Sequence, residues 1–302
     1  MTRSHATGLI LLFMTAAIWG AGFVAQREGA AAIPPLTFNA TRFFIGCLSL
    51  LPVIALFSKP RGESGPRSAM LIGGIAGGAL LFVGINLQQT ALAVTTAGKA
   101  AFITGLYIIF VPLIGRMLGT RIGGKVFVAA GLSLAGLYLL SVNDGLKLAP
   151  GDGLVVVCAV FWALQVLVTG HFAPQLDGPR FAFMQFATVA VLSALGALLF
   201  ETISLEALVI NWWPLAFTGI VATGLAFTLQ ILAQARVAPT QAALVLSLET
   251  VFGALAGWAI LDEVFAPRAM LGAALMLGGI LLAQLPGIRM RKPIRLWFAR
   301  RG

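Results

Sequence analysis

The stretch from Ala238 to Glu263 most constrains what this chain can fold into. It is long and apolar enough to cross a lipid bilayer, because about 20 helical residues, each rising about 1.5 Å, span a hydrocarbon core of about 30 Å. Glu249 nevertheless stands near its middle, where a charge costs at least about 2.5 kcal/mol. Its carboxyl group either pairs with a neighbouring helix or serves as a site for a cation or a coupling proton. Carboxyl groups inside membranes are usually functional, which favours the second interpretation.

The composition extends this constraint to the whole chain. Of the 302 residues, 59% are hydrophobic and only 10% are charged, whereas soluble domains carry about 25% charged residues. We therefore expect an all-α integral membrane protein. Cys47 and Cys158 fall within apolar stretches and lack metal-ligand spacing, so neither a disulfide nor a metal site is predicted. Hydropathy predicts ten transmembrane helices, at residues 8–26, 36–57, 69–90, 95–116, 122–141, 153–172, 180–200, 212–234, 239–261 and 268–286.

The basic residues predict the orientation of these helices. With ten spans, fifteen Lys and Arg residues lie on the side that carries both termini, and three lie opposite, namely Arg27, Lys147 and Arg268. This asymmetry predicts cytoplasmic termini. The net charge of +10 then reflects orientation and contact with anionic lipids of the inner leaflet, and does not indicate nucleic-acid binding. The first span follows Arg3 as a secretory signal would, but its AAIWGAGF (16–23) is echoed by CAVFWALQ (158–165), so we interpret it as a membrane helix.

An internal repeat divides the chain. A constant offset of 142 in the numbering superposes the two halves from the third span onward, and near the start the offset is 143; the matches include Gly77 with Gly219, Gln88 with Gln230, Gly136 with Gly278 and Trp19 with Trp162. Five spans per half is an odd number, so the two halves would lie inverted in the membrane. Inverted repeats place a binding site between them and operate by alternating access, as in transporters. We expect repeats at 1–146 and 147–288, followed by a basic cytoplasmic tail at 289–302.

Polar and aromatic side chains within the spans are the candidates for a substrate site. A single amide more often bonds a neighbouring helix than a ligand, and a single aromatic ring more often packs. Together, however, they predict a polar cavity. Glu249 is in addition the candidate for proton coupling. The predicted substrate-binding residues are Trp19, Asn39, Arg42, Asn86, Lys99, Tyr107, Trp162, Gln165, Gln185, Gln230 and Glu249.

Three motifs make the chain resemble a known family: AAIWGAGF (16–23), TTAGKAAFITGLYIIFVPLIG (95–115) and SLETVFGALAGWAILDE (247–263). They are similar to the ten-helix EamA-type exporter branch of the drug/metabolite transporter superfamily, over essentially the whole chain. Thr250 stands where a proline is common in such sequences. The resemblance implies a cavity lined by the first four helices of each half. It also implies export of amino acids or related small metabolites across the inner membrane of a bacterium.

The charges inside the spans suit a zwitterion. Arg42 and Lys99 would meet a carboxylate and Glu249 an ammonium group, which makes an amino-acid or metabolite exporter the leading hypothesis. An exporter of cationic drugs, using Glu249 and aromatic walls, is the alternative. A sugar-phosphate carrier, a receptor, a lipid scramblase and an intramembrane enzyme are less favoured; for an enzyme, neither His5 nor His171 belongs to a catalytic pattern. We expect no cofactor, and either a monomer or a homodimer.

Overall fold

The computed structural model describes residues 3–58, 60, 64–91, 103–141, 151–261 and 267–285. Within these ranges the fold is all-helical and contains no strand, as predicted. The first half holds α1 (Arg3–Ala32), α2 (Pro35–Phe57), α3 (Arg67–Ala91), α5 (Tyr107–Met117) and α6 (Gly124–Ser141). The second half holds α7 (Asp152–Phe172), η2 (Ala173–Gln175), α8 (Gly178–Phe200), α9 (Leu205–Ile210), α10 (Trp212–Ala216), η3 (Phe217–Phe227), α11 (Thr228–Gln234), α12 (Pro239–Leu246), α13 (Glu249–Leu261) and α14 (Pro267–Gln284).

Eight helical stretches in the described residues are long and apolar enough to cross a membrane. They fall where eight of the ten spans were predicted. At the fourth and fifth predicted spans the described apolar helices, α5 and α6, are shorter; residues 92–102 lie outside the described ranges. The chain is therefore a multi-pass membrane protein, and the total of ten spans stays a prediction.

The ninth predicted span is not one straight helix. It is divided into α12 and α13, with Ser247 and Leu248 between them. The Ser247 hydroxyl donates to the Leu244 carbonyl oxygen at 2.8 Å, and the Thr250 hydroxyl donates to the Ser247 carbonyl oxygen at 2.6 Å. Such side-chain bonds compete with the regular helical pattern. As a result, Glu249 is the first residue of a helix rather than the middle of one.

Helices α2 and α8 pack in opposite directions, and each is bonded to the end of the other. At one end, the Glu201 carboxylate accepts the backbone N–H groups of Leu36 and Thr37 at 2.8 and 2.7 Å. At the other end, the Ser58 hydroxyl donates to the Asp177 carboxylate at 2.7 Å. Ser58 and Glu201 match at the offset of 143, so corresponding positions of the two halves make both contacts.

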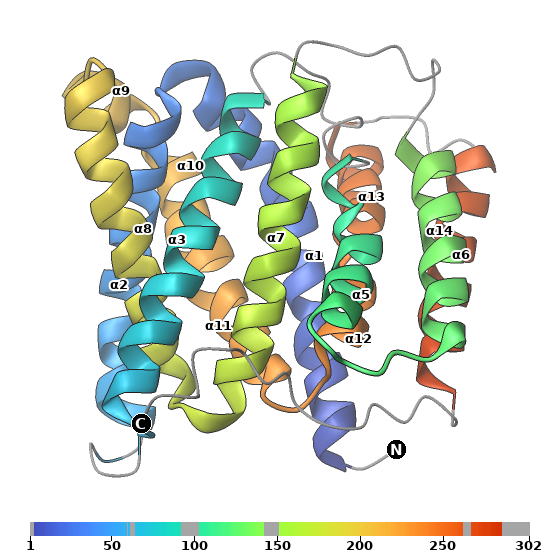
Figure 1. The fold of residues 1–302 in the computed structure, drawn as a ribbon. Helices are drawn as coiled ribbons and strands as arrows, with labels where there is room; N and C mark the ends of the chain where they lie inside the picture. Colours follow the sequence, from blue (N-terminus) through green and yellow to red (C-terminus); the bar gives the residue numbers. More distant parts are fainter. Residues whose placement is uncertain are drawn as a thin grey trace.

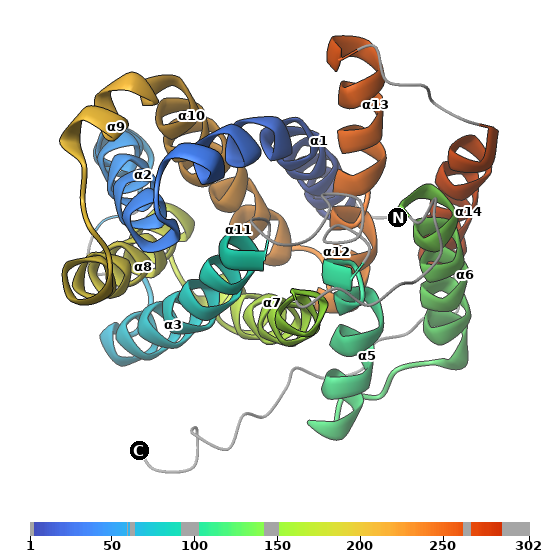
Figure 2. The same cartoon turned by 90° about the horizontal axis from the view of Figure 1, so that it is seen from above.

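Helices α6 and α14 form a second pair, at the edge of the molecule (Figure 2). A Cβ atom on Gly136 would lie 2.4 Å from the Gly272 carbonyl oxygen, and one on Gly279 would lie 2.6 Å from the Ala129 carbonyl oxygen. These two contacts are related by an offset of 143. Gly136 thus corresponds in space to Gly279, one residue beyond its predicted match Gly278.

The remaining long helices, from both halves, surround the centre of the molecule (Figures 1 and 2). Corresponding helices run in opposite directions: in Figure 1, α1 begins at the bottom of the view and α7 at the top. The eighth predicted span consists of α10, η3 and α11, and η3 is a π-helix. It packs against α1, where the Thr15 hydroxyl donates to the Ala226 carbonyl oxygen at 3.2 Å.

Candidate functional site

A cavity opens between the central helices of the two halves, with an empty volume of about 570 Å³ that includes its open side. Neither α6 nor α14 contributes to its lining, which agrees with the expectation that the fifth and tenth helices are peripheral. The lining residues are Trp19, Gln26, Arg42, Ile85, Gln88, Thr104, Tyr107, Trp162, Val166, Ala222, Thr223, Phe227, Gln230, Leu246 and Glu249.

Arg42 brings a positive charge into this cavity. The residue is only 2% exposed, and its guanidinium lies over the rings of Phe38 and Phe43, with centroid distances of 5.7 and 5.1 Å. Its Nε is buried without a hydrogen-bond acceptor, and it makes no ion pair within the described residues. Because a buried charge without a counter-ion is costly, the arrangement suits an anionic group that arrives from the cavity.

Glu249 supplies a carboxyl group to the same cavity. It begins α13, where the positive end of the helix dipole stabilises a carboxylate. The Tyr107 hydroxyl, from the corresponding position of the first half, is within hydrogen-bonding reach of this carboxyl group. The structure therefore brings together Tyr107 and Glu249, which the repeat related in the sequence. The carboxyl group can accept hydrogen bonds from an ammonium group or take up a proton.

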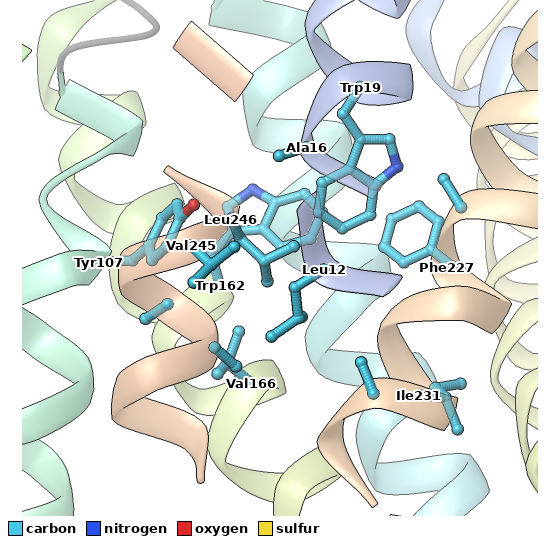
Figure 3. Packing of buried hydrophobic residues seen from close by; sticks show 14 of the residues in the cluster. Leu12, Ala16, Trp19, Tyr107, Trp162, Val166, Phe227, Ile231, Val245 and Leu246 are labelled. Carbon is cyan, nitrogen blue, oxygen red and sulfur yellow. The ribbon is translucent and has the colours of Figure 1, made fainter. Parts of the chain in front are cut away.

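Aromatic rings from Trp19, Trp162 and Phe227 lie close together (Figure 3) and form part of the cavity wall. The Phe227 ring lies 4.6 Å from the ring of Trp19 and is stacked on that of Trp162 at 5.9 Å. The Trp19 indole N–H donates to the Ala222 carbonyl oxygen at 2.9 Å. The Trp162 indole N–H, by contrast, is buried without a hydrogen bond of normal geometry to any described residue. Both predicted tryptophans thus line the cavity, with different hydrogen bonding.

Four predicted site residues do not line the cavity but join amide networks beside it. Asn39 donates to Asn86 at 2.8 Å. Gln165 donates to Gln185 at 3.3 Å and accepts from Gln230, which does reach the cavity, at 3.3 Å. These contacts match the interhelical alternative that the sequence left open. Lys99 lies outside the described residues.

Four polar residues of the lining were absent from the predicted set, namely Gln26, Gln88, Thr104 and Thr223. Within the described residues, Gln26 Oε1 and the hydroxyls of Thr104 and Thr223 are buried without hydrogen bonds of normal geometry, so they too offer polar atoms to a ligand. The repeat could have identified Gln88, because it matches Gln230, which was selected. Thr104 and Thr223 carry no signal that separates them from ordinary small helical residues.

Comparison with known proteins decides the family. The sequence profile of the EamA-like transporter family matches residues 6–142 and, a second time, residues 149–285. The chain belongs to the EamA-like transporter family. A protein from Archaeoglobus fulgidus named as an uncharacterized transporter is 31% identical over 275 residues, covering 91% of this chain and 84% of its own. The uncharacterized transporter YoaV of Bacillus subtilis is 25% identical over 275 residues, covering 88% and 92%.

A solved crystal structure shares the fold of this EamA chain. It covers 95% of this chain and 99% of its own, with a TM-score of 0.77 and 21% sequence identity. Family and relatives together identify a membrane transporter.

Proposed function

We propose that this EamA transporter exports amino acids or related zwitterionic metabolites by alternating access between two inverted five-helix repeats, residues 1–146 and 147–288. Its proposed place is the inner membrane of a bacterium, with both termini in the cytoplasm.

One observation carries the proposal: within the described residues, the cavity holds a guanidinium and a carboxyl group that do not pair with each other. Arg42 and Glu249 both line it, yet no ion pair joins them within the described residues. A zwitterion supplies the missing partner of each group, its carboxylate at Arg42 and its ammonium group at Glu249. An arginine fits this role because its guanidinium can bind both oxygens of a carboxylate.

Three features support inverted repeats. The family profile matches each half separately. Corresponding helices run in opposite directions (Figure 1). The contacts of the α2–α8 and α6–α14 pairs recur at an offset of 143 in the numbering. A cavity between such repeats can be exposed to the two membrane faces in turn.

The test is flux in liposomes that contain the purified protein, measured with labelled amino acids, a cationic dye and a sugar phosphate, with and without a pH gradient. We expect saturable amino-acid flux that is lost in both Arg42→Gln and Glu249→Gln. Arg268→Gln is the matched control, because this exposed arginine also lies over an aromatic ring, that of Tyr138 at 5.5 Å, but outside the cavity. Amino-acid flux that persists in both cavity variants would contradict the zwitterion assignment.

A cationic drug exporter is the second candidate, favoured by the aromatic wall next to Glu249. Aromatic faces attract cations, and such a substrate needs no contact with Arg42. Dye flux that survives Arg42→Gln but not Glu249→Gln would establish this alternative.

A further inference from the structure

The indole N–H of Trp162 has no hydrogen-bond acceptor at normal geometry among the described residues. Trp19 and Trp162 correspond at the offset of 143, and Trp19 donates to the Ala222 carbonyl oxygen. The Trp162 N–H is buried and makes no hydrogen bond of normal geometry within the described residues. It lies next to the Cys158 sulfur, a weak acceptor, whose own thiol donates to the Gly84 carbonyl oxygen. Leaving a buried donor unpaired destabilises a protein, so the missing acceptor calls for an explanation.

The two helices that face these tryptophans differ in winding. Ala222 belongs to η3, which is π-helical from Phe217 to Phe227, whereas the corresponding part of α3 is a regular α-helix. π-Helical segments are rare and often occur at functional sites. A wider turn changes which carbonyl oxygen faces the tryptophan.

A second pair of contacts shows where α3 and η3 are in the same register. The Thr15 hydroxyl donates to the Ala226 carbonyl oxygen at 3.2 Å. Correspondingly, the Cys158 thiol donates to the Gly84 carbonyl oxygen at 3.2 Å. Thr15 and Cys158 match at the same offset as the two tryptophans, so Gly84 of α3 takes the place that Ala226 takes after the π-helical turn.

Where α3 and η3 pack against α8 and α2, their registers differ by one residue. A Cβ atom on Gly219 would meet the Ile45 Cβ at 2.7 Å and the Arg42 carbonyl oxygen at 3.0 Å. In α3, Gly78 makes the equivalent contacts, with the Thr188 Cβ at 2.5 Å and the Gln185 carbonyl oxygen at 2.7 Å. The same distance is therefore covered by six residue steps in α3, from Gly78 to Gly84, and by seven steps through η3, from Gly219 to Ala226.

The sequence of α3 is also compatible with seven residue steps over this distance, as in η3. Gly77 precedes Gly78 and is the residue that matches Gly219 at the offset of 142. Since both are glycines, either can occupy the close contact with α8. A π-turn in α3 would bring Gly77 to Thr188 and Gln185. It would also place the Leu80 carbonyl oxygen opposite Trp162, as Ala222 is placed opposite Trp19.

We propose that α3 has a second winding, with a π-turn between Gly77 and Gly84, in which the Trp162 indole donates to the Leu80 carbonyl oxygen. Conversion shifts the segment from Arg67 to Gly77 by one residue, about 1.5 Å and 100°, relative to Ile85 and Gln88 in the cavity. Resting on the proposed transport function, this shift couples the cavity to the end of α3 that packs on α8. Trp162 is then a positioning residue that stabilises one of two windings.

The two glycines provide opposite tests. In the present winding, the three atoms nearest to a Cβ on Gly77 all belong to the end of the Gln185 side chain, at 2.9–3.2 Å, and this flexible end can move aside. In the second winding it would take the crowded place of Gly78, so Gly77→Ala holds α3 in the present winding. Gly78→Ala instead clashes with Thr188 and the α8 backbone in the present winding, and favours the second.

The measurement is the indole ¹⁵N–¹H NMR spectrum of the full chain in lipid nanodiscs. The chain has six tryptophans, and Trp162→Phe identifies the signal of interest. We expect this signal to report two environments in the unaltered protein, split or broadened by exchange. Gly77→Ala should leave only the unbonded indole, Gly78→Ala should enrich the hydrogen-bonded one, and Gly131→Ala, with open space around its Cβ, should change nothing.

A single Trp162 signal that responds to neither glycine variant would overturn the second winding. If Gly78→Ala does not fold, Gly77→Ala still decides, because it should lower the maximal flux severalfold while the substrate dissociation constant stays unchanged. Absence of flux from the unaltered protein, together with the expected indole signals, would contradict the proposed transport function and leave the second winding standing.

Discussion

At the scale of single residues, Arg42 is placed for binding at the expense of stability. Among the described residues its buried charge meets no anion, and the contacts that compensate it are with the faces of Phe38 and Phe43. Such cation–π contacts contribute about 0.5–2 kcal/mol, which is less than the several kcal/mol that desolvation of an ion costs. The missing stabilisation is what a bound carboxylate would supply.

Arg42→Met should therefore leave the protein at least as stable as before, or more stable by about 1–4 kcal/mol, while flux is lost. Thermal unfolding in detergent without substrate measures the first effect and the liposome assay the second. In Arg268→Met, the exposed counterpart, both quantities should change little, by under about 0.5 kcal/mol in stability. A strongly destabilised Arg42→Met would show that the guanidinium has a structural role.

At the scale of helices, the crossing of α6 and α14 depends on glycine for close approach. A methyl group at Gly136 would lie 2.4 Å from the Gly272 carbonyl oxygen and 2.8 Å from the Met276 backbone nitrogen. Both are backbone atoms that cannot turn aside, so the helices would have to separate.

Gly136→Ala should accordingly destabilise the protein by about 1–3 kcal/mol. Gly131→Ala, in the same helix, has no atom within 4 Å of its new methyl group and should be neutral or stabilising by up to about 1 kcal/mol. Thermal unfolding of the two variants side by side gives the comparison. Equal stability would mean that the two helices do not cross at Gly136.

The sequence predicted the positions of the helices better than their internal geometry. Apolar length located the described spans, and the repeat related Tyr107 to Glu249. Neither the division at Ser247 nor the π-helix from Phe217 to Phe227 could be predicted, because both depend on local hydrogen bonds and on how α1 packs. Likewise, the sequence marks Arg42 and Gln185 alike, as polar residues inside predicted spans. The packing of the helices decides that Arg42 reaches the cavity while Gln185 bonds Gln165.

At the scale of the whole molecule, the charge asymmetry makes a prediction about orientation. Fifteen Lys and Arg residues lie on one predicted face and three on the other, so both termini should be cytoplasmic. Single cysteines at exposed Thr7 and Ser204 can be tested in intact cells with a maleimide that does not cross membranes; the natural cysteines, Cys47 and Cys158, are buried. Labelling is expected at Ser204→Cys alone, and labelling of Thr7→Cys alone would reverse the topology.

The hydrogen bonds that join α2 and α8 at both ends bear on the voltage dependence of the proposed transport. Glu201 holds the start of α2 and Asp177 holds its end, and Arg42 lies between the two. In the proposed alternating access, we expect this joined pair of helices to move as one unit while the other walls of the cavity move relative to it. The Arg42 guanidinium would then keep its depth in the membrane field through the proposed cycle. Moving one charge through that field involves about 2.3 kcal/mol per 100 mV, so we expect the voltage dependence of the proposed transport to come from the substrate and Glu249.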